Sequence, residues 1–213
     1  MRMRREKMEK FEDKVDVKRY DYLINARNFH YNNFNLWMVF FAVIIGGILA
    51  GYCALLEKNN LKFEQIILLT AGYFTSFIWH LSCKGYYYWI INFIKLIFKC
   101  EEKLEDAEKV YSCFANKKNN NCYFNITKGA NISTAVMICI LSYFTAIFWA
   151  VMFFYKLLPV IIPEICTESE KINIPCVFIS LVSAIVITAI FMLMVRYCKR
   201  FHSDISYHAD LKL

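Results

Sequence analysis

Four long runs of apolar residues divide the chain. Residues 36–56, 66–83, 134–155 and 176–195 contain no Asp, Glu, Lys or Arg, and these runs are 21, 18, 22 and 20 residues long. An α-helix needs about 20 apolar residues to cross a hydrocarbon core of about 30 Å. The runs lack the alternation of a lipid-facing barrel strand, so helices are the expected spanning structure. The pattern predicts an all-α, four-helix multi-pass membrane protein.

The apolar runs and their flanks set the expected boundaries. We expect transmembrane spans at 36–56, 64–83, 134–156 and 176–197. An amino arm (1–35) precedes the first span, and a tail (198–213) follows the last. A helical extension and loop (84–133) lies between the second and third spans, and a short loop (157–175) lies between the third and fourth. The first run follows a polar arm and is too long for a signal-peptide core, so the first span is expected to be a retained signal anchor.

Basic residues predict the orientation. The amino arm carries nine Lys and Arg, segment 84–133 carries eight, and the last part of the chain from Arg196 carries four, whereas loop 157–175 has only Lys171. The positive-inside rule therefore places both termini and segment 84–133 in the cytoplasm, and loop 157–175 in the periplasm of a bacterium. The net charge of +7 then reflects residues beside the membrane, which suit anionic lipid headgroups at the cytoplasmic face. No nucleic-acid partner is expected.

Small residues recur along the first span at four-residue steps. Two adjacent ridges contain Ala42, Gly46, Ala50 and Ala54, and Gly47 and Gly51. Similar ridges recur at Gly72 and Ser76, at Ser142, Ala146 and Ala150, and at Ser180, Ala184 and Thr188. Small side chains let two helix backbones approach closely in lipid. The spacing predicts tight helix packing, and the ridge of the first span suits contact within one subunit as well as contact between subunits.

Helical periodicity continues beyond the second span. Apolar side chains at alternating steps of four and three residues form a heptad seam, consisting of Phe93, Ile97, Cys100, Leu104, Ala107 and Tyr111. A helix over 66–111 would be about 70 Å long. The second span should therefore continue as a long cytoplasmic helix that lies along the surface, bends at Gly85 or projects away. Because this seam is apolar, it needs a partner, which can be either the amino arm or another copy of the chain.

Three polar side chains lie four residues apart in the second span, namely Ser76, His80 and Lys84. An ionisable group in a span is costly unless it faces a bundle interior, water or headgroups. His80 and Lys84 can be residues of the membrane edge, since a lysine side chain can reach the headgroups. The alternative interpretation is a pH-sensitive stripe, because histidine titrates near physiological pH.

Cysteine spacing gives two alternatives for the outer loop. Cys166 and Cys176 have nine residues between them and can form a disulfide in an oxidising compartment. Cys176 can instead begin the fourth span as a small apolar residue. The remaining loop cysteines match no zinc pattern, and the chain contains no phosphate-binding loop, HExxH or Gly-x-Ser-x-Gly motif. We therefore expect no metal, no cofactor and no enzyme activity.

A cluster at the end of the second span resembles a family signature. This collar consists of Trp79, Lys84, Gly85 and Trp89. With Phe93, Glu101 and Glu102 behind it, the collar is similar to the signature of the RipA family of octameric bacterial inner-membrane proteins. Arg27, Asn28 and Phe29 before the first span, and residues 123–128 before the third, are similar too. The chain departs from the signature at residues 86–88, which are tyrosines where small and basic residues are usual, and at Phe93, where tryptophan is usual.

The resemblance implies a homo-oligomer, an octamer, in a bacterial inner membrane. It also implies an association with envelope adaptation, including stress adaptation, and with virulence through growth inside host cells. Combined with the residues, it favours a non-enzymatic scaffold whose amino arm and extended second helix mediate assembly. The alternative is a pH-responsive channel or transporter that uses the stripe of Ser76, His80 and Lys84. The lack of charged residues in the spans argues against a water-filled pore, because polar groups normally line such a pore.

Overall fold

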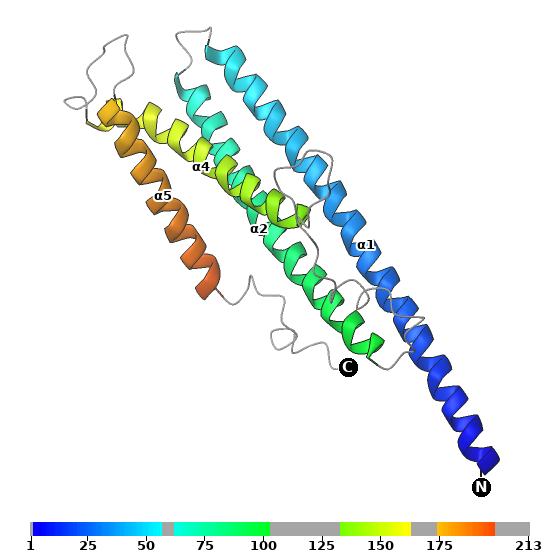
Figure 1. The fold of residues 1–213 in the computed structure, drawn as a ribbon. Helices are drawn as coiled ribbons and strands as arrows, with labels where there is room; N and C mark the ends of the chain where they lie inside the picture. Colours follow the sequence, from blue (N-terminus) through cyan, green and yellow to red (C-terminus); the bar gives the residue numbers. More distant parts are fainter. Residues whose placement is uncertain (1, 57–61, 103–132, 163–173, 199–213) are drawn as a thin grey trace, which may run out of the picture. The chain divides into compact units, whose positions relative to one another are not determined.

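The computed structural model describes residues 2–56, 62–102, 133–162 and 174–198 of the chain. These residues form four helices and contain no strand. The helices are α1 (Arg2–Leu56), α2 (Lys62–Glu101), α4 (Thr134–Ile161) and α5 (Ile174–Tyr197), as Figure 1 shows. The expected all-α class is confirmed.

Each helix contains one of the apolar runs and is long enough to cross a membrane. The spanning candidates are Val17–Leu56, Phe63–Glu101, Thr134–Ile161 and Ile174–Tyr197. Even the shortest, with 24 residues, measures about 36 Å and exceeds a hydrocarbon core of about 30 Å. The chain is therefore a multi-pass membrane protein with four candidate spans.

Two of the helices are much longer than a span. α1 has 55 residues and α2 has 40, which correspond to about 80 Å and 60 Å. α1 joins the amino arm to the first span without a break, and α2 runs through Gly85 into the heptad seam. Of that seam, Phe93, Ile97 and Cys100 lie in α2, while Leu104, Ala107 and Tyr111 lie outside the described residues.

Several backbone groups at the helix ends are paired by side-chain hydrogen bonds, and a proline occupies a position where no amide hydrogen is needed. The Ser133 hydroxyl oxygen accepts a hydrogen bond from the Val136 backbone N–H, with 3.4 Å between Oγ and N, and so caps the beginning of α4. At the end of α1, the Gln65 side-chain amide donates to the Leu55 carbonyl at 2.9 Å, which provides one of the missing partners of a helix terminus. Pro175 follows the first residue of α5, where a missing amide hydrogen costs little. These features help to define the end of α1 and the beginnings of α4 and α5.

The chain forms two compact units. Unit 1 combines Met1–Ala42 with Trp79–Ile140, and unit 2 combines Val43–Ile78 with Leu141–Leu213. The buried side chains of unit 1 include Phe34, Met38, Trp79, Cys83 and Ile97, and those of unit 2 include Leu69, Ala146, Trp149, Ala150 and Ala184. α2 is the most buried helix, with 44% of its most apolar stretch covered against 17% in α1 and 22% in α4 and α5.

Candidate functional site

The amino arm packs on the α2 extension in unit 1 through an aromatic cluster. The His30 ring stacks on Trp89 at 6.4 Å between centroids and 20° between planes, and it lies 4.9 Å from Phe93. Trp89 and Phe93 are four residues apart, so they share one face of α2. The first residue of the heptad seam therefore contacts the amino arm, which is one of the two partners predicted for it.

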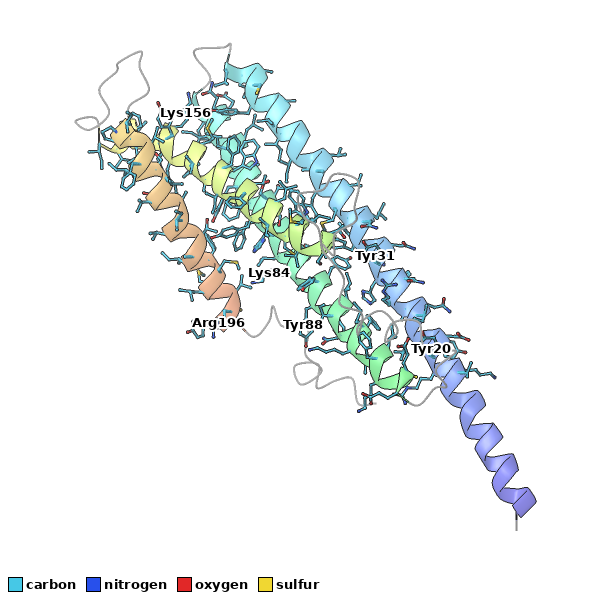
Figure 2. The ribbon with its side chains drawn as sticks, in the orientation of Figure 1. Tyr20, Tyr31, Lys84, Tyr88, Lys156 and Arg196 are labelled. Carbon is cyan, nitrogen blue, oxygen red and sulfur yellow. The ribbon has the colours of Figure 1, made fainter. Side chains whose placement is uncertain are left out.

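The same helix pair is joined again near the end of α2. The Tyr20 hydroxyl donates to a carboxylate oxygen of Glu101 at 2.8 Å, although 81 residues separate the two in sequence. Glu101 is completely buried, as is Ile97 one turn before it. Figure 2 shows Tyr20 and Tyr31 on α1, and Lys84 and Tyr88 on α2. Hydrogen bonding to a buried carboxylate fixes the register of the two helices more strictly than apolar contact alone.

The collar divides into an inward and an outward part. Trp79 stacks on Phe41 at 6.5 Å, and its indole N–H donates to the Met38 sulfur at 2.9 Å. Trp89 stacks on His30 of α1. Lys84 and Gly85 are exposed, and among the described residues only the adjoining backbone of α2 lies near the position that a Cβ on Gly85 would take. The tryptophans thus hold α1 against α2, while the basic-Gly pair faces outward.

The residues of the polar stripe have different surroundings. Ser76 is fully buried in unit 2 and His80 is buried in unit 1, whereas Lys84 is exposed. His80 Nδ1 lies 3.1 Å from the Cys139 carbonyl oxygen on α4. A carbonyl can only accept, so Nδ1 carries the proton of this bond. His80 therefore joins α2 to α4 within unit 1.

Three of the small-residue ridges are buried inside unit 2. Ser142, Ala146 and Ala150 on α4, and Ser180, Ala184 and Thr188 on α5, are almost completely covered. Gly72 on α2 lies directly beneath the Trp149 ring, and a Cβ added to Gly72 would come within 2.5 Å of that ring. Trp149 also packs edge-on against Tyr52 of α1 at 6.4 Å. The close approach of α2 and α4 in unit 2 therefore depends on a residue without a side chain.

The ridge of the first span is different, because it is exposed. In unit 2, Gly46, Gly47, Ala50 and Ala54 are exposed, and Gly51 is partly covered by Leu68. In unit 1, Ala42 is exposed as well. Ala50 and the buried Tyr52 are two residues apart, about 200° around the helix, so they lie on opposite sides of α1. Apart from the adjoining backbone of α1 itself, no atom of the described residues lies within 4 Å of a Cβ placed on Gly46 or Gly47.

Some predicted residues cannot be placed, and some contacts were missed. Cys166 lies outside the described residues, so its disulfide with Cys176 stays a prediction. Cys176 itself is buried against Leu158 at the start of α5. No sequence pattern singles out His30, Met38 or Trp149, although Trp89 and Phe93 at a spacing of four residues indicate an aromatic face that needs a partner. Among the described residues, no group of three or more His, Cys, Asp or Glu could hold a metal ion.

The family model of the octameric membrane protein family (8xMP) matches residues 17–158. The match contains the collar, the described part of the heptad seam and the exposed ridge of α1. Neither a curated protein nor a solved structure matches the chain.

Proposed function

The chain belongs to the octameric membrane protein family, and we propose that it acts as a non-enzymatic homo-octameric scaffold in a bacterial inner membrane. The family match supports the octamer. The distribution of Lys and Arg supports cytoplasmic termini. The lack of a catalytic motif in the sequence supports a role without chemistry. The association with envelope adaptation and growth inside host cells comes from the resemblance to RipA and is part of the same proposal.

The observation that carries the proposal is the exposed ridge of α1. Small-residue ridges run through all four spans, and those of the second, third and fourth spans are buried against neighbouring helices of the same subunit. Helices in lipid associate through such small-residue surfaces, because apolar side chains gain little from leaving lipid tails. The ridge containing Gly46 and Ala50 has no such neighbour within the described chain. A second copy of the subunit is the partner that an octamer supplies.

The paired amino arm and α2 extension provide the scaffold part of the proposal. His30 on Trp89 and Tyr20 on Glu101 hold these two segments together within unit 1. In the proposed orientation both segments leave the membrane on the cytoplasmic side, where the exposed Lys84 can reach anionic headgroups. Eight such pairs would present a repeated helical surface to cytoplasmic partners.

The pH-responsive channel has less support than the scaffold. His80 is buried and bonded to the Cys139 carbonyl, whereas Lys84 is exposed, so the two groups do not face the same environment. A pH-sensitive pathway would require that they share an aqueous surface.

Enlarging the α1 ridge should dissociate the octamer without unfolding the subunit. The double variant Gly46→Leu, Ala50→Leu adds bulk at two positions that are exposed in the described part of the subunit, but where a second helix would approach closely. Overpacking of this kind costs about 1–3 kcal/mol per site, and eight interfaces multiply the effect. Native mass spectrometry of detergent-purified protein should show eight 25.2-kDa subunits for the wild type and smaller assemblies for the variant.

The control for this experiment is Ala189→Leu. Ala189 is also exposed in a membrane-spanning helix of unit 2, and it lies in α5 outside the buried ridge of that helix. This variant should remain octameric. If the α1 double variant also stays octameric while its helix content is unchanged, the ridge is not the subunit contact. A wild-type protein of any other size would overturn the octamer itself.

A further inference from the structure

Three helices of unit 2 line a cavity of about 160 Å³. Its walls include Tyr73 and Phe74 from α2, Ala150 and Phe153 from α4, and Ile187 and Phe191 from α5. All of these residues lie inside the expected spans 64–83, 134–156 and 176–197. The cavity is partly open to the surface of the unit, so a molecule can enter it from the side.

The lining is apolar because the hydroxyl groups around it bond elsewhere. The Thr70 hydroxyl donates to the Ile66 carbonyl at 2.8 Å, within its own helix. The Tyr73 hydroxyl lies 3.4 Å from the Thr188 hydroxyl, which is part of the buried ridge of α5. A buried water needs two to four polar partners, and this surface exposes none to the cavity. Water is therefore excluded as the occupant.

Aromatic side chains keep the cavity open. Phe191 meets Phe74 edge-on at 5.9 Å and 82°, and it lies 5.7 Å from Phe77 and 6.2 Å from Tyr73. Rings in such mutual contact have few rotamers into which they can collapse. The cavity is thus a preformed feature of this helix trio, and filling it requires an additional molecule.

We propose that this cavity binds a segment of a lipid acyl chain. Close-packed interiors contain few voids of this size, because wall atoms without neighbours lose their dispersion contacts. An apolar cavity of about 150 Å³ in a soluble protein stays dry and binds benzene, so a void of this kind is large enough for an apolar ligand. In a membrane, the apolar molecules present at the highest concentration are acyl chains. The binding free energy comes from filling the void, since transfer between two apolar surroundings contributes little.

A photoreactive lipid provides the test. The full-length protein is reconstituted into phosphatidylcholine vesicles that contain a phospholipid with a diazirine near the methyl end of one acyl chain. After illumination, mass spectrometry locates the adducts. We expect adducts to concentrate on peptides that contain Phe153, Ile187 and Phe191. Exposed positions at a similar depth, such as Phe148 near the middle of α4, should react much less.

Filling the cavity from the protein side should remove these adducts. In Ala150→Leu, the added carbon atoms occupy a large part of the void, and labelling of the lining should fall roughly tenfold, in line with the dependence of cavity energies on volume. Ala189→Leu is the matched control, because it makes the same change on the lipid-facing side of α5. Its labelling should equal that of the wild type.

A second variant keeps the test decisive if Ala150→Leu does not fold. Ile187→Phe fills the same cavity from α5 and should also reduce the labelling of Phe153. Adducts spread evenly over all exposed membrane-facing residues of the wild type would overturn the proposal. The same conclusion follows if either folded filling variant labels the lining as strongly as the wild type.

Discussion

Replacing Ile97 by aspartate should separate the amino arm from the α2 extension. Ile97 is 0% exposed, and Phe93 one turn before it contacts His30 of the arm. The change removes a buried apolar side chain and introduces a carboxylate, which together cost about 4 kcal/mol or more. Hydrogen exchange by mass spectrometry should show at least about a hundredfold loss of amide protection over residues 20–34. The thermal midpoint in detergent should fall by about 10 °C.

Leu96→Asp is the control, because it places the same charge one residue away. Leu96 is 44% exposed, so its carboxylate can remain hydrated outside the helix pair. Protection of the amino arm should then stay close to that of the wild type. Equal loss of protection in both variants would mean that charge on α2, and not burial of Ile97, controls the contact.

The spans and the fold class could be predicted from the sequence because they depend on local properties. A run such as 36–56 has to cross the membrane or be buried, whatever it packs against. The long helix was predictable for the same reason, since a periodicity of 3.5 residues continues from the second span into Phe93, Ile97 and Cys100. The amino arm was one of two partners open to this seam, and contact with His30 identifies it for Phe93.

The packing partners could not be predicted, because small residues indicate how closely a helix can be approached but not by which helix. Ala50 and Ala150 occur in ridges of the same spacing, yet Ala50 is exposed and Ala150 is buried. His30 gave no signal either, since a single histidine in a polar arm belongs to no periodic pattern. The bond between Tyr20 and Glu101 joins residues 81 positions apart, and no local pattern specifies such a pair.

Gly72→Ala should destabilise unit 2 although alanine favours helix formation. A Cβ at position 72 would lie 2.5 Å from the Trp149 ring, and Trp149 is 1% exposed and held by Tyr52 on another side. The ring therefore has little room to move, and overpacking should cost about 3 kcal/mol. The higher helix propensity of alanine stabilises the helix by about 1 kcal/mol relative to glycine. The net loss of about 2 kcal/mol should lower the thermal midpoint by about 4–8 °C.

Two further variants assign this loss to the clash. Gly85→Ala makes the same change in the same helix, at a position where the described residues of other helices leave open space, so it should keep or raise the midpoint. Trp149→Ala removes the ring atoms that meet residue 72, namely Cδ2, Cε2 and Cε3, at a cost of its own. In the double variant Gly72→Ala, Trp149→Ala, the alanine at position 72 should no longer be harmful, because its contact is gone. Strictly additive midpoints would contradict this account, since residues in direct contact are expected to show a coupling energy.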